Sequence, residues 1–336
     1  MKKIGFIGGK FLPFHKGHEQ AIITASKQVE KLYVILSSSE KRDKELCEAS
    51  HINYIPQETR MAWLGYTFAG YHNIIVRNVI DKDSETDYDW DKGAELIKDT
   101  IEEKIDVVFS SEHEYDVYFK KNFPDAEHIV IDAERSRVPI SATRIRKNIY
   151  KYWNFLPVIV QTYFAIKVAL VGIDSTGKST LCQKLANVYD CPWVPEVGRE
   201  MTEKYNNNFT ASMFDLIAIE QFSETEKVRF MASPFVFIDS EAVITQYYLK
   251  EYHYKESVFI EALIKRQDID LYIYMEPDIP WVADGYRLHR TTEERKVKNV
   301  ELKQMFTDRD IEIIPIYGDF EERLEKACDV LDNYLK

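Results

Sequence analysis

Cysteine is scarce in this sequence and is not arranged for metal binding. The four cysteines are scattered, with no C-x-x-C pair and no close histidine cluster; they are Cys47, Cys182, Cys191 and Cys328. A structural zinc site needs closely spaced Cys and His ligands, so this spacing argues against one. It predicts reduced and mostly structural thiols.

Long apolar runs are also missing. The N-terminal letters MKKIGFIGG reach glycine before they could form the apolar centre of a signal peptide, which indicates the cytoplasm. The most apolar stretch, residues 155–172, contains Pro157, Gln161 and Lys167 and leads into a glycine-rich turn. A linker followed by a buried strand explains it better than a membrane span.

Positive charge is in deficit. The chain has 56 Asp and Glu against 44 Lys and Arg, a formal net charge of −12. Such a surface repels nucleic acid and anionic membranes, so a phosphate-bearing ligand must be met by local basic groups. Small nucleotides are therefore better candidate partners than DNA.

What the sequence does contain is the pattern of two α/β units. A chain of 336 residues is more than one core usually organises. Short β-branched runs alternate with helical patterns, as in parallel sheets with helices on both faces, and residues 150–157 sustain neither period. We expect two doubly wound parallel-sheet domains, residues 1–160 and 161–336. The expected strands are residues 4–7, 32–36, 74–79, 106–109, 128–131, 167–171, 235–238, 271–274 and 312–316.

Glycine is rare, and half of it lies in two short segments. Of the 12 glycines, six follow or belong to the first strand of each domain: Gly5, Gly8, Gly9, Gly17, Gly172 and Gly177. In an open parallel sheet such turns lie at the carboxyl edge of the strands, where helix N-termini point at anions. Both segments are therefore candidate phosphate sites.

The second segment reads GIDSTGKS over residues 172–179 and matches the pattern G-x-x-x-x-G-K-[ST] between a strand and an expected helix at 180–188. In this pattern backbone N–H groups wrap a β-phosphate, Lys178 spreads positive charge over the β- and γ-phosphates, and the Ser179 hydroxyl binds Mg²⁺. The segment predicts an Mg²⁺–ATP site.

The residues after this loop favour a small-molecule kinase. The base-reading and switch motifs of GTPases are missing beyond residue 180. Asp239 ends an apolar strand and is suited to hold Mg²⁺ through water. Arg287, Arg290 and Arg295 lie in a polar stretch that could close over ATP, although a solvated helix face is the alternative explanation.

A short apolar run at residues 192–195 could be a further strand that brings Glu196, Arg199 and Glu200 near the loop. A carboxylate there could bind substrate hydroxyls or accept the proton of the attacking group, and Asp174 inside the loop competes for that role. A surface ion pair explains Arg199 and Glu200 nearly as well.

The first glycine segment, GGKFLPFHKGH over residues 8–18, ends in H-x-G-H at a helix entrance. His15 and His18 would place two imidazole donors and a helix N-terminus around one phosphate. This suits the stabilisation of charge on an α-phosphate during in-line attack, with pyrophosphate leaving and no covalent intermediate required.

A complementary segment, ISATRIR, occupies residues 140–146. Ser141 could cap a helix whose first turn offers Thr143 and Arg146 to phosphates. H-x-G-H together with I-S-x-T-x-I-R resembles the nucleotidyltransferase superfamily, whose members transfer AMP or CMP to a phosphate and release pyrophosphate. Class I aminoacyl-tRNA synthetases share the first motif, but their K-M-S-K-S-like loop is missing here.

The combination and order of motifs resembles one family across essentially the whole chain, the bifunctional nicotinamide-nucleotide adenylyltransferase/ribosylnicotinamide kinases (NadR). The motifs are GKF at 9–11, RMAWL at 60–64, SSE at 110–112, Tyr152-Trp153 and Pro157 after Arg146, E-x-x-RE at 196–200 and PWV-x-DG at 280–285. The resemblance implies a Rossmann-like nucleotidyltransferase domain followed by a P-loop kinase domain.

The resemblance also implies activities and site residues. The second domain would phosphorylate nicotinamide riboside to NMN with ATP and Mg²⁺, and the first would join NMN to AMP and form NAD. The implied catalytic residues are His15, His18, Arg146, Lys178, Asp239 and Glu196. The implied ATP-binding residues are Gly8, Gly9, Lys10, Phe11, Ser141, Thr143, Gly172, Asp174, Ser175, Thr176, Gly177, Ser179, Thr180, Arg287 and Arg290. Trp63, Arg199 and Glu200 are implied for substrate, and Ser179 and Asp239 for the metal.

Some members of this family begin with a helix-turn-helix domain and repress transcription. Here the expected catalytic strand starts at Ile4, so we expect no DNA binding. Feedback by NAD, a homo-oligomer and a functional link to a riboside transporter stay open. So do two rival functions: the same chemistries on another nucleotide-like substrate, which the generic phosphate machinery permits, and a nucleotide-sensing regulator without turnover.

Overall fold

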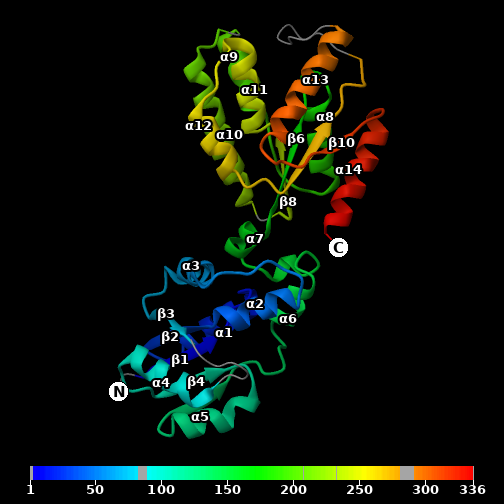
Figure 1. The fold of residues 1–336 in the computed structure, drawn as a ribbon. Coiled ribbons are helices and arrows are strands. Elements are labelled where there is room, and N and C mark those ends of the chain that lie inside the picture. Colours follow the sequence, from blue (N-terminus) through cyan, green and yellow to red (C-terminus); the bar gives the residue numbers. More distant parts are fainter. Residues whose placement is uncertain (1–2, 82–88, 207, 232, 281–290, 336) are drawn as a thin grey trace. The chain divides into compact units, whose positions relative to one another are not determined.

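The computed structural model describes residues 3–81, 89–206, 208–231, 233–280 and 291–335. The chain divides into two compact units, Met1–Val160 and Gln161–Lys336. Each unit is built around its own parallel sheet, and helix α7 (Val158–Phe164) contains the division (Figure 1).

The first unit has a five-stranded sheet in the order β3-β2-β1-β4-β5, with every pairing parallel. Its strands are β1 (Ile4–Gly9), β2 (Lys31–Ser38), β3 (Ile74–Ile80), β4 (Val107–Ser110) and β5 (Glu127–Val130). Its helices are α1 (Lys16–Ser26), α2 (Glu40–Glu48), α3 (Gln57–Phe68), α4 (Trp90–Ile101), α5 (Asp116–Asn122) and α6 (Ala142–Lys147), with short 3-10 turns η1 (His113–Tyr115) and η2 (Trp153–Phe155).

The second unit has the strand order β10-β9-β6-β8-β7, again all parallel. Its strands are β6 (Ile166–Val171), β7 (Trp193–Val194), β8 (Phe235–Asp239), β9 (Leu271–Met275) and β10 (Ile314–Ile316). Its helices are α8 (Lys178–Val188), α9 (Val197–Tyr205), α10 (Ala211–Arg229), α11 (Ala242–His253), α12 (Val258–Arg266), α13 (Thr292–Thr307) and α14 (Phe320–Tyr334).

The predicted fold class is confirmed, because both units are doubly wound around parallel sheets. All nine expected strands are present with ends shifted by one or two residues, and the run at 192–195 forms β7. The expected helix at 180–188 begins two residues earlier, at Lys178. Gly177 adopts a left-handed conformation at the helix N-cap, so the chain can enter the helix as soon as the loop closes.

Each sheet is covered by helices on both faces. In the first unit Phe6, Ile35 and Val108 pack with α4 residues such as Ile97, while α1 and α3 contact the sheet as well. In the second unit, successive side chains of β6 point to opposite faces of the sheet. Val171 joins a core with α11, α12 and α13, whereas α8 packs against α14 and the sheet.

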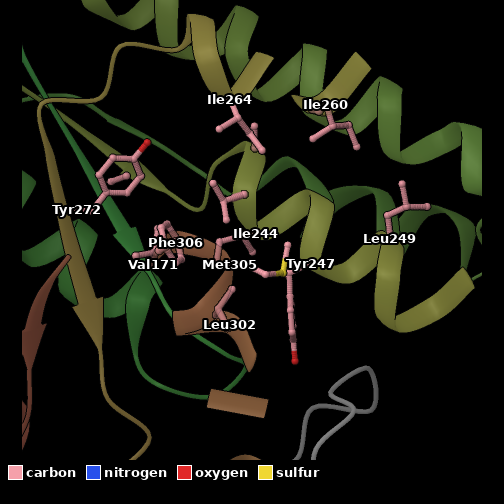
Figure 2. Packing of buried hydrophobic residues seen from close by; sticks show 14 of the residues in the cluster. Val171, Ile244, Tyr247, Leu249, Ile260, Ile264, Tyr272, Leu302, Met305 and Phe306 are labelled. Carbon is pink, nitrogen blue, oxygen red and sulfur yellow. The ribbon is translucent and has the colours of Figure 1, made fainter. Parts of the chain in front are cut away.

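Figure 2 shows the larger of these cores. Ile244 and Tyr247 of α11, Ile260 and Ile264 of α12, and Leu302, Met305 and Phe306 of α13 converge beside Val171. Each of these side chains is at most 8% exposed, and burying a side chain of this size stabilises a fold by roughly 1.5–3 kcal/mol. This packing anchors β6 directly before the loop that carries the predicted phosphate site.

Candidate active sites

A cavity of about 510 Å³ lies at the carboxyl ends of β1 and β4 in the first unit. The strand order reverses direction between these two strands, which is where an open α/β sheet forms its ligand crevice. The predicted site residues that line this cavity are Gly8, Gly9, Lys10, Phe11, His15, His18, Ser141 and Thr143. The structure therefore brings the two halves of the nucleotidyltransferase-like motif together around one space.

His15 is the N-cap of α1. Its Nδ1 accepts hydrogen bonds from the backbone N–H groups of Gly17 at 3.1 Å and His18 at 3.3 Å. Because Nδ1 is an acceptor, Nε2 carries the ring hydrogen, and the neutral imidazole remains a donor at that atom. The cap thus satisfies two orphan N–H groups of the helix and sets the tautomer of His15 at once.

Both histidines of the motif are held in the neutral form. Burial lowers the pKa of His15 to about 3, with a smaller contribution from the positive charge of Arg135. Burial also keeps the pKa of His18 well below its usual value, and the neighbouring His15 adds to this effect. The two rings stack at 3.6 Å between centroids. They can donate hydrogen bonds to a phosphate without bringing a positive charge.

Lys10 is held at the rim of this cavity by a buried carboxylate that the sequence analysis missed. Its Nζ lies 2.6 Å from Asp43 Oδ1, while Arg60 donates to Asp43 Oδ2 at 2.7 Å and to the Lys10 carbonyl at 2.9 Å. The side chains of Asp43 and Arg60 are fully buried. A buried charge of either sign needs a partner of opposite sign. A search for an acid and a base that could pair beside Lys10 could therefore have found Asp43 and Arg60.

Arg146 is placed differently from the other predicted residues. It is 8% exposed, does not line the cavity, and donates to the Leu12 carbonyl at 2.6 Å and to Thr143 Oγ1 at 3.2 Å. Ser141 caps α6 by accepting from the Arg144 N–H at 3.3 Å. In this structure Arg146 braces the loop that leads to His15 through the Leu12 carbonyl, and its Nε donates to Ser50 Oγ at 3.4 Å.

Trp63 also lies away from the cavity. It sits on α3, is 3% exposed and is not among the cavity-lining residues. The R-M-A-W-L stretch therefore contributes Arg60 to the Lys10 cluster and Trp63 to the interior. A role for Trp63 in substrate binding stays a prediction.

In the second unit, residues 172–178 form the predicted phosphate loop, which connects β6 to α8. Gly172 has φ +140°, and a Cβ atom at this position would meet the Met275 carbonyl at 2.7 Å. Gly177 has φ +85°. Both positions thus require glycine, the first because of a close approach and both because of their conformation. Asp174, Ser175 and Thr176 complete the turn.

The loop lysine is folded back onto its own loop. Lys178 is 7% exposed, and its Nζ donates to the carbonyls of Gly172 at 3.1 Å and Ile173 at 3.2 Å. Ser179 and Thr180 are exposed in the first turn of α8. The ammonium group is held in place over the loop, from where it reaches a phosphate seated on the N–H groups.

Asp239 fits the predicted metal role. It ends β8, pairs in register with Leu170, and is hydrogen-bonded to the Ser179 side chain. It is 1% exposed, and its Oδ1 has no hydrogen-bond partner among the described residues. Burial raises the pKa of this carboxyl, while Lys178 and Ser179 oppose that shift. A buried oxygen without a partner beside a serine hydroxyl is a donor set for a magnesium ion.

Glu196 faces the same loop. Part of its side chain is accessible, but protein surrounds the carboxyl, and this burial raises its pKa to about 7. Lys178 opposes the shift, and the carboxylates of Asp239 and Asp174 reinforce it. A carboxyl that titrates near neutrality beside a phosphate loop is suited to accept a proton.

A smaller cavity of about 90 Å³ adjoins these carboxylates. Asp174, Glu196 and Arg199 line it together with aromatic residues such as Tyr248, whose hydroxyl donates to Asp174 Oδ1. Glu200 is exposed and does not line it. Of the predicted substrate residues in this unit, Arg199 is at the cavity and Glu200 is not.

Comparison with known proteins matches each unit separately and the chain as a whole. Residues 6–148 match the cytidylyltransferase-like family and residues 167–323 match an AAA domain family. The chain is 32% identical over 347 aligned residues to the trifunctional NAD biosynthesis/regulator protein NadR of Escherichia coli (strain K12), covering 98% of this chain and 83% of that protein. The chain belongs to the NadR family.

Further relatives agree with this membership. The NadR protein of Salmonella typhimurium (strain LT2) is 31% identical over 98% of this chain and 83% of its own length. A crystal structure of NadR in complex with NR has a TM-score of 0.79 at 24% identity, and covers 99% of this chain and 96% of that one. A crystal structure of NadR with NAD and AMP-PNP has a TM-score of 0.77 at 23% identity, and covers 100% and 96%. These two structures share the fold of this chain.

Two buried arginines of this NadR family member donate hydrogen bonds to carbonyl groups of the predicted phosphate loop. Arg295 of α13, predicted to close over ATP, is 4% exposed and donates to the carbonyls of Asp174 at 2.8 Å and Ser175 at 3.4 Å. Arg323 of α14, which the sequence analysis missed, is 2% exposed and donates to the Thr176 carbonyl at 2.6 Å. Their guanidinium groups give hydrogen bonds to three consecutive carbonyls of the tight turn.

Arg287 and Arg290 lie outside the described residues, as does most of the P-W-V-x-D-G stretch. Within the described ranges, no group of three or more His, Cys, Asp and Glu side chains is arranged to hold a metal ion. All four cysteines are free. No helix in the described part of the chain has the length and apolarity needed to cross a membrane.

Proposed function

We propose that this NadR family member carries out two consecutive steps of NAD formation. The second unit phosphorylates nicotinamide riboside to NMN with ATP, and the first unit transfers AMP from ATP to NMN, which forms NAD and releases pyrophosphate. The observation that carries the proposal is the presence, in one chain of this family, of two separate glycine-bearing strand–turn–helix units at the carboxyl edges of two parallel sheets, where such units bind phosphates in other proteins.

Known relatives support the choice of substrates. The relatives named above are NAD biosynthesis proteins, and NadR crystal structures hold NR in one case and NAD with an ATP analogue in another. The proposal extends to this chain the riboside and ATP as substrates, NMN as intermediate and NAD as product. It also includes binding of NAD as a feedback ligand, a homo-oligomer and work beside a riboside transporter in the cytoplasm, where ATP is available.

In the first unit, a phosphate oxygen of NMN attacks the α-phosphorus of ATP, and the bond to pyrophosphate breaks. Negative charge then spreads over the oxygens around the α-phosphorus and the leaving group. His15 and His18 meet this charge as neutral donors, because burial keeps both rings unprotonated. Lys10 adds the positive charge at the rim of the cavity.

In the second unit, a ribose hydroxyl of the riboside attacks the γ-phosphorus of ATP, and the bond from the γ-phosphorus to ADP breaks. Lys178 and the N–H groups of the loop hold the phosphates in line. Glu196 accepts the hydroxyl proton, because its pKa of about 7 lets it exist as a base at neutral pH. Asp174 is less suited to this role, since its carboxylate already accepts a hydrogen bond from Tyr248. Arg199 binds substrate beside it.

In the proposed kinase, Asp239 and Ser179 would hold Mg²⁺. A bound ion would supply positive charge to the β- and γ-phosphates. Burial raises the pKa of the Asp239 carboxyl, and the chain's own contribution is to oppose that rise through Lys178 and the Ser179 hydroxyl.

The first experiment incubates purified protein with Mg²⁺–ATP and either nicotinamide riboside or NMN, followed by chromatographic separation of NMN, NAD, ADP and pyrophosphate. NAD from both substrates is the expected result. NMN alone from the riboside would restrict the proposal to the second unit. No product from either substrate would reject it, and a panel of other nucleosides and phosphorylated small molecules would follow.

A further inference from the structure

Three side chains of the first unit form a hydrogen-bonded chain that ends at the larger cavity. Ser110 Oγ lies 2.8 Å from His128 Nε2, and His128 Nδ1 lies 3.0 Å from Asp116 Oδ1. Ser110 is the last residue of β4 and lines the cavity, whereas the side chain of His128, on the adjacent strand β5, is 3% exposed. The ring of Phe119 lies 5.0 Å from the imidazole and packs against it.

The hydrogen bonds that link Ser110, His128 and Asp116 all run in one direction. Asp116 accepts from His128 at one carboxylate oxygen and from Lys120 at the other, so it has no hydrogen to donate. Nδ1 of His128 must therefore carry a hydrogen, and the neutral ring presents Nε2 to Ser110 as an acceptor. The hydroxyl hydrogen of Ser110 then points at His128, away from the cavity.

The other contacts of Ser110 also lie inside the protein. The Glu112 carbonyl, 3.0 Å from Oγ, is a second acceptor for the hydroxyl hydrogen, and the Glu112 backbone N–H donates to Oγ at 3.4 Å. The single hydrogen of Ser110 and one of its two lone pairs are therefore used inside the protein. Beside the neutral His128 ring, one lone pair of Ser110 is left for a ligand.

The surroundings of Ser110 strengthen its acceptor character. The carboxylate of Glu112 also lines the cavity, where it accepts a hydrogen bond from Arg135 at 3.3 Å. An N–H or O–H donor on a ligand can satisfy the free lone pair of Ser110. A carboxylate or phosphate oxygen in the same place would face that lone pair without a hydrogen between the two oxygens, which costs free energy unless water separates them.

We propose that Ser110 is a specificity-determining residue of the first unit, which accepts a hydrogen bond from a neutral N–H or O–H group of a bound nucleotide, and that His128 and Asp116 are its positioning residues. The donor group belongs either to the pyridine nucleotide, whose carboxamide carries N–H groups, or to ATP, whose base and ribose carry donors. The inference rests on the proposed adenylyl transfer and names a residue within that site.

The test compares Ser110→Ala with Ser110→Thr in steady-state NAD formation from NMN and ATP. Loss of one neutral hydrogen bond should raise the KM of the substrate that supplies the donor by about three- to tenfold, with little change in kcat. Threonine keeps the hydroxyl and should restore that KM. A rise in the NMN value, together with weaker discrimination against nicotinic acid mononucleotide, assigns the donor to the carboxamide; a rise in the ATP value assigns it to ATP.

The positioning role is tested with Asp116→Asn, an exposed substitution that removes the charge that sets the His128 tautomer. It should raise the same KM as Ser110→Ala, and the double variant should be no worse than Ser110→Ala alone, because Asp116 acts through Ser110. Asp125→Asn, an exposed acid of the same unit, is the matched control and should leave both KM values unchanged.

The proposal is wrong if Ser110→Ala leaves both KM values within experimental error, or if it raises both and threonine restores neither. Additive effects of Asp116→Asn and Ser110→Ala would overturn the positioning role. Calorimetric Kd values for NMN and ATP on the same variants keep this test separate from the proposed function, since they need no turnover.

Discussion

The two proposed phosphate sites of this protein would handle negative charge by different means. The site of the first unit is built around two neutral imidazoles, because burial lowers the pKa values of His15 and His18. The site of the second unit places a charged lysine, Lys178, against carboxylates whose pKa values burial raises. The first site combines neutral donors with the paired Lys10 at its rim, and the second places its lysine among buried carboxylates.

The difference matches the chemistry proposed for each unit. The phosphate group of NMN attacks as an anion, so adenylyl transfer needs donors around the α-phosphorus and no group to remove a proton. A ribose hydroxyl carries a hydrogen that it must lose, so the kinase needs a carboxylate that can accept it. Glu196 has that property at neutral pH, whereas the histidines of the first site do not exchange protons there.

The largest expected effect comes from Lys178→Ala. Removing the ammonium group should lower riboside phosphorylation by about 10²–10³-fold, because a preorganised charge at the transferring phosphate is lost. NMN adenylylation should stay unchanged, since Lys178 belongs to the second unit. Both rates are measured on the same preparation, and loss of both would show that the sites depend on each other.

A somewhat smaller effect is expected from His18→Ala. NAD formation from NMN should fall by about 10²-fold, as one neutral donor to the α-phosphate disappears. Phosphorylation of the riboside serves as the internal control and should be retained. A rate of NAD formation within tenfold of the wild type would mean that His18 has been assigned wrongly.

The buried Arg323 allows a test of how hydrogen bonds to the loop backbone stabilise the predicted phosphate loop. Arg323→Met removes the partner of the Thr176 carbonyl and should destabilise the region around the phosphate loop by roughly 1–3 kcal/mol. Hydrogen exchange followed by mass spectrometry should show faster exchange in peptides covering residues 172–188. Peptides from the first unit provide the control, and equal acceleration in both units would contradict a local role.

The smallest effect is a difference in pH dependence. Glu196 must lose its proton to act as a base, so the kinase rate should rise as pH increases through about 7 and then level off. His15, with a pKa of about 3, stays neutral at and above neutral pH. The rate of adenylyl transfer should therefore show no inflection near the usual pKa of histidine. In Glu196→Gln the kinase should be slow at every pH; a retained inflection near 7 would assign it to another group.

Local sequence rules predicted much of both sites. Strand–turn–helix patterns with glycines at the turns predicted where the chain turns from strand to helix, since backbone geometry at those turns depends on few neighbouring residues. His15, His18, Lys178 and Asp239 lie at the expected strand ends. Arg146 and Trp63 show the limit of this reasoning, because a residue type within a motif does not tell whether its side chain faces the cavity or the interior.

Sequence motifs alone could not predict the contacts between residues that are far apart in the sequence. Asp43 and Arg60 hold Lys10 from α2 and α3, and Arg323 reaches the phosphate loop across 147 residues. Ser110 gains its acceptor character only when β5 places His128 beside it. None of these pairs has a spacing that a linear pattern could detect.

The sequence by itself determined the two α/β units, the two phosphate-binding turns and the residue types that line them, because hydrophobic periodicity and glycine conformation act over short distances. Only the tertiary structure decided which histidines are neutral, which carboxyl can act as a base and which hydroxyl can only accept. Those properties depend on burial and on charges from other strands and helices, and the physical reason is that desolvation and Coulomb interactions act through space rather than along the chain.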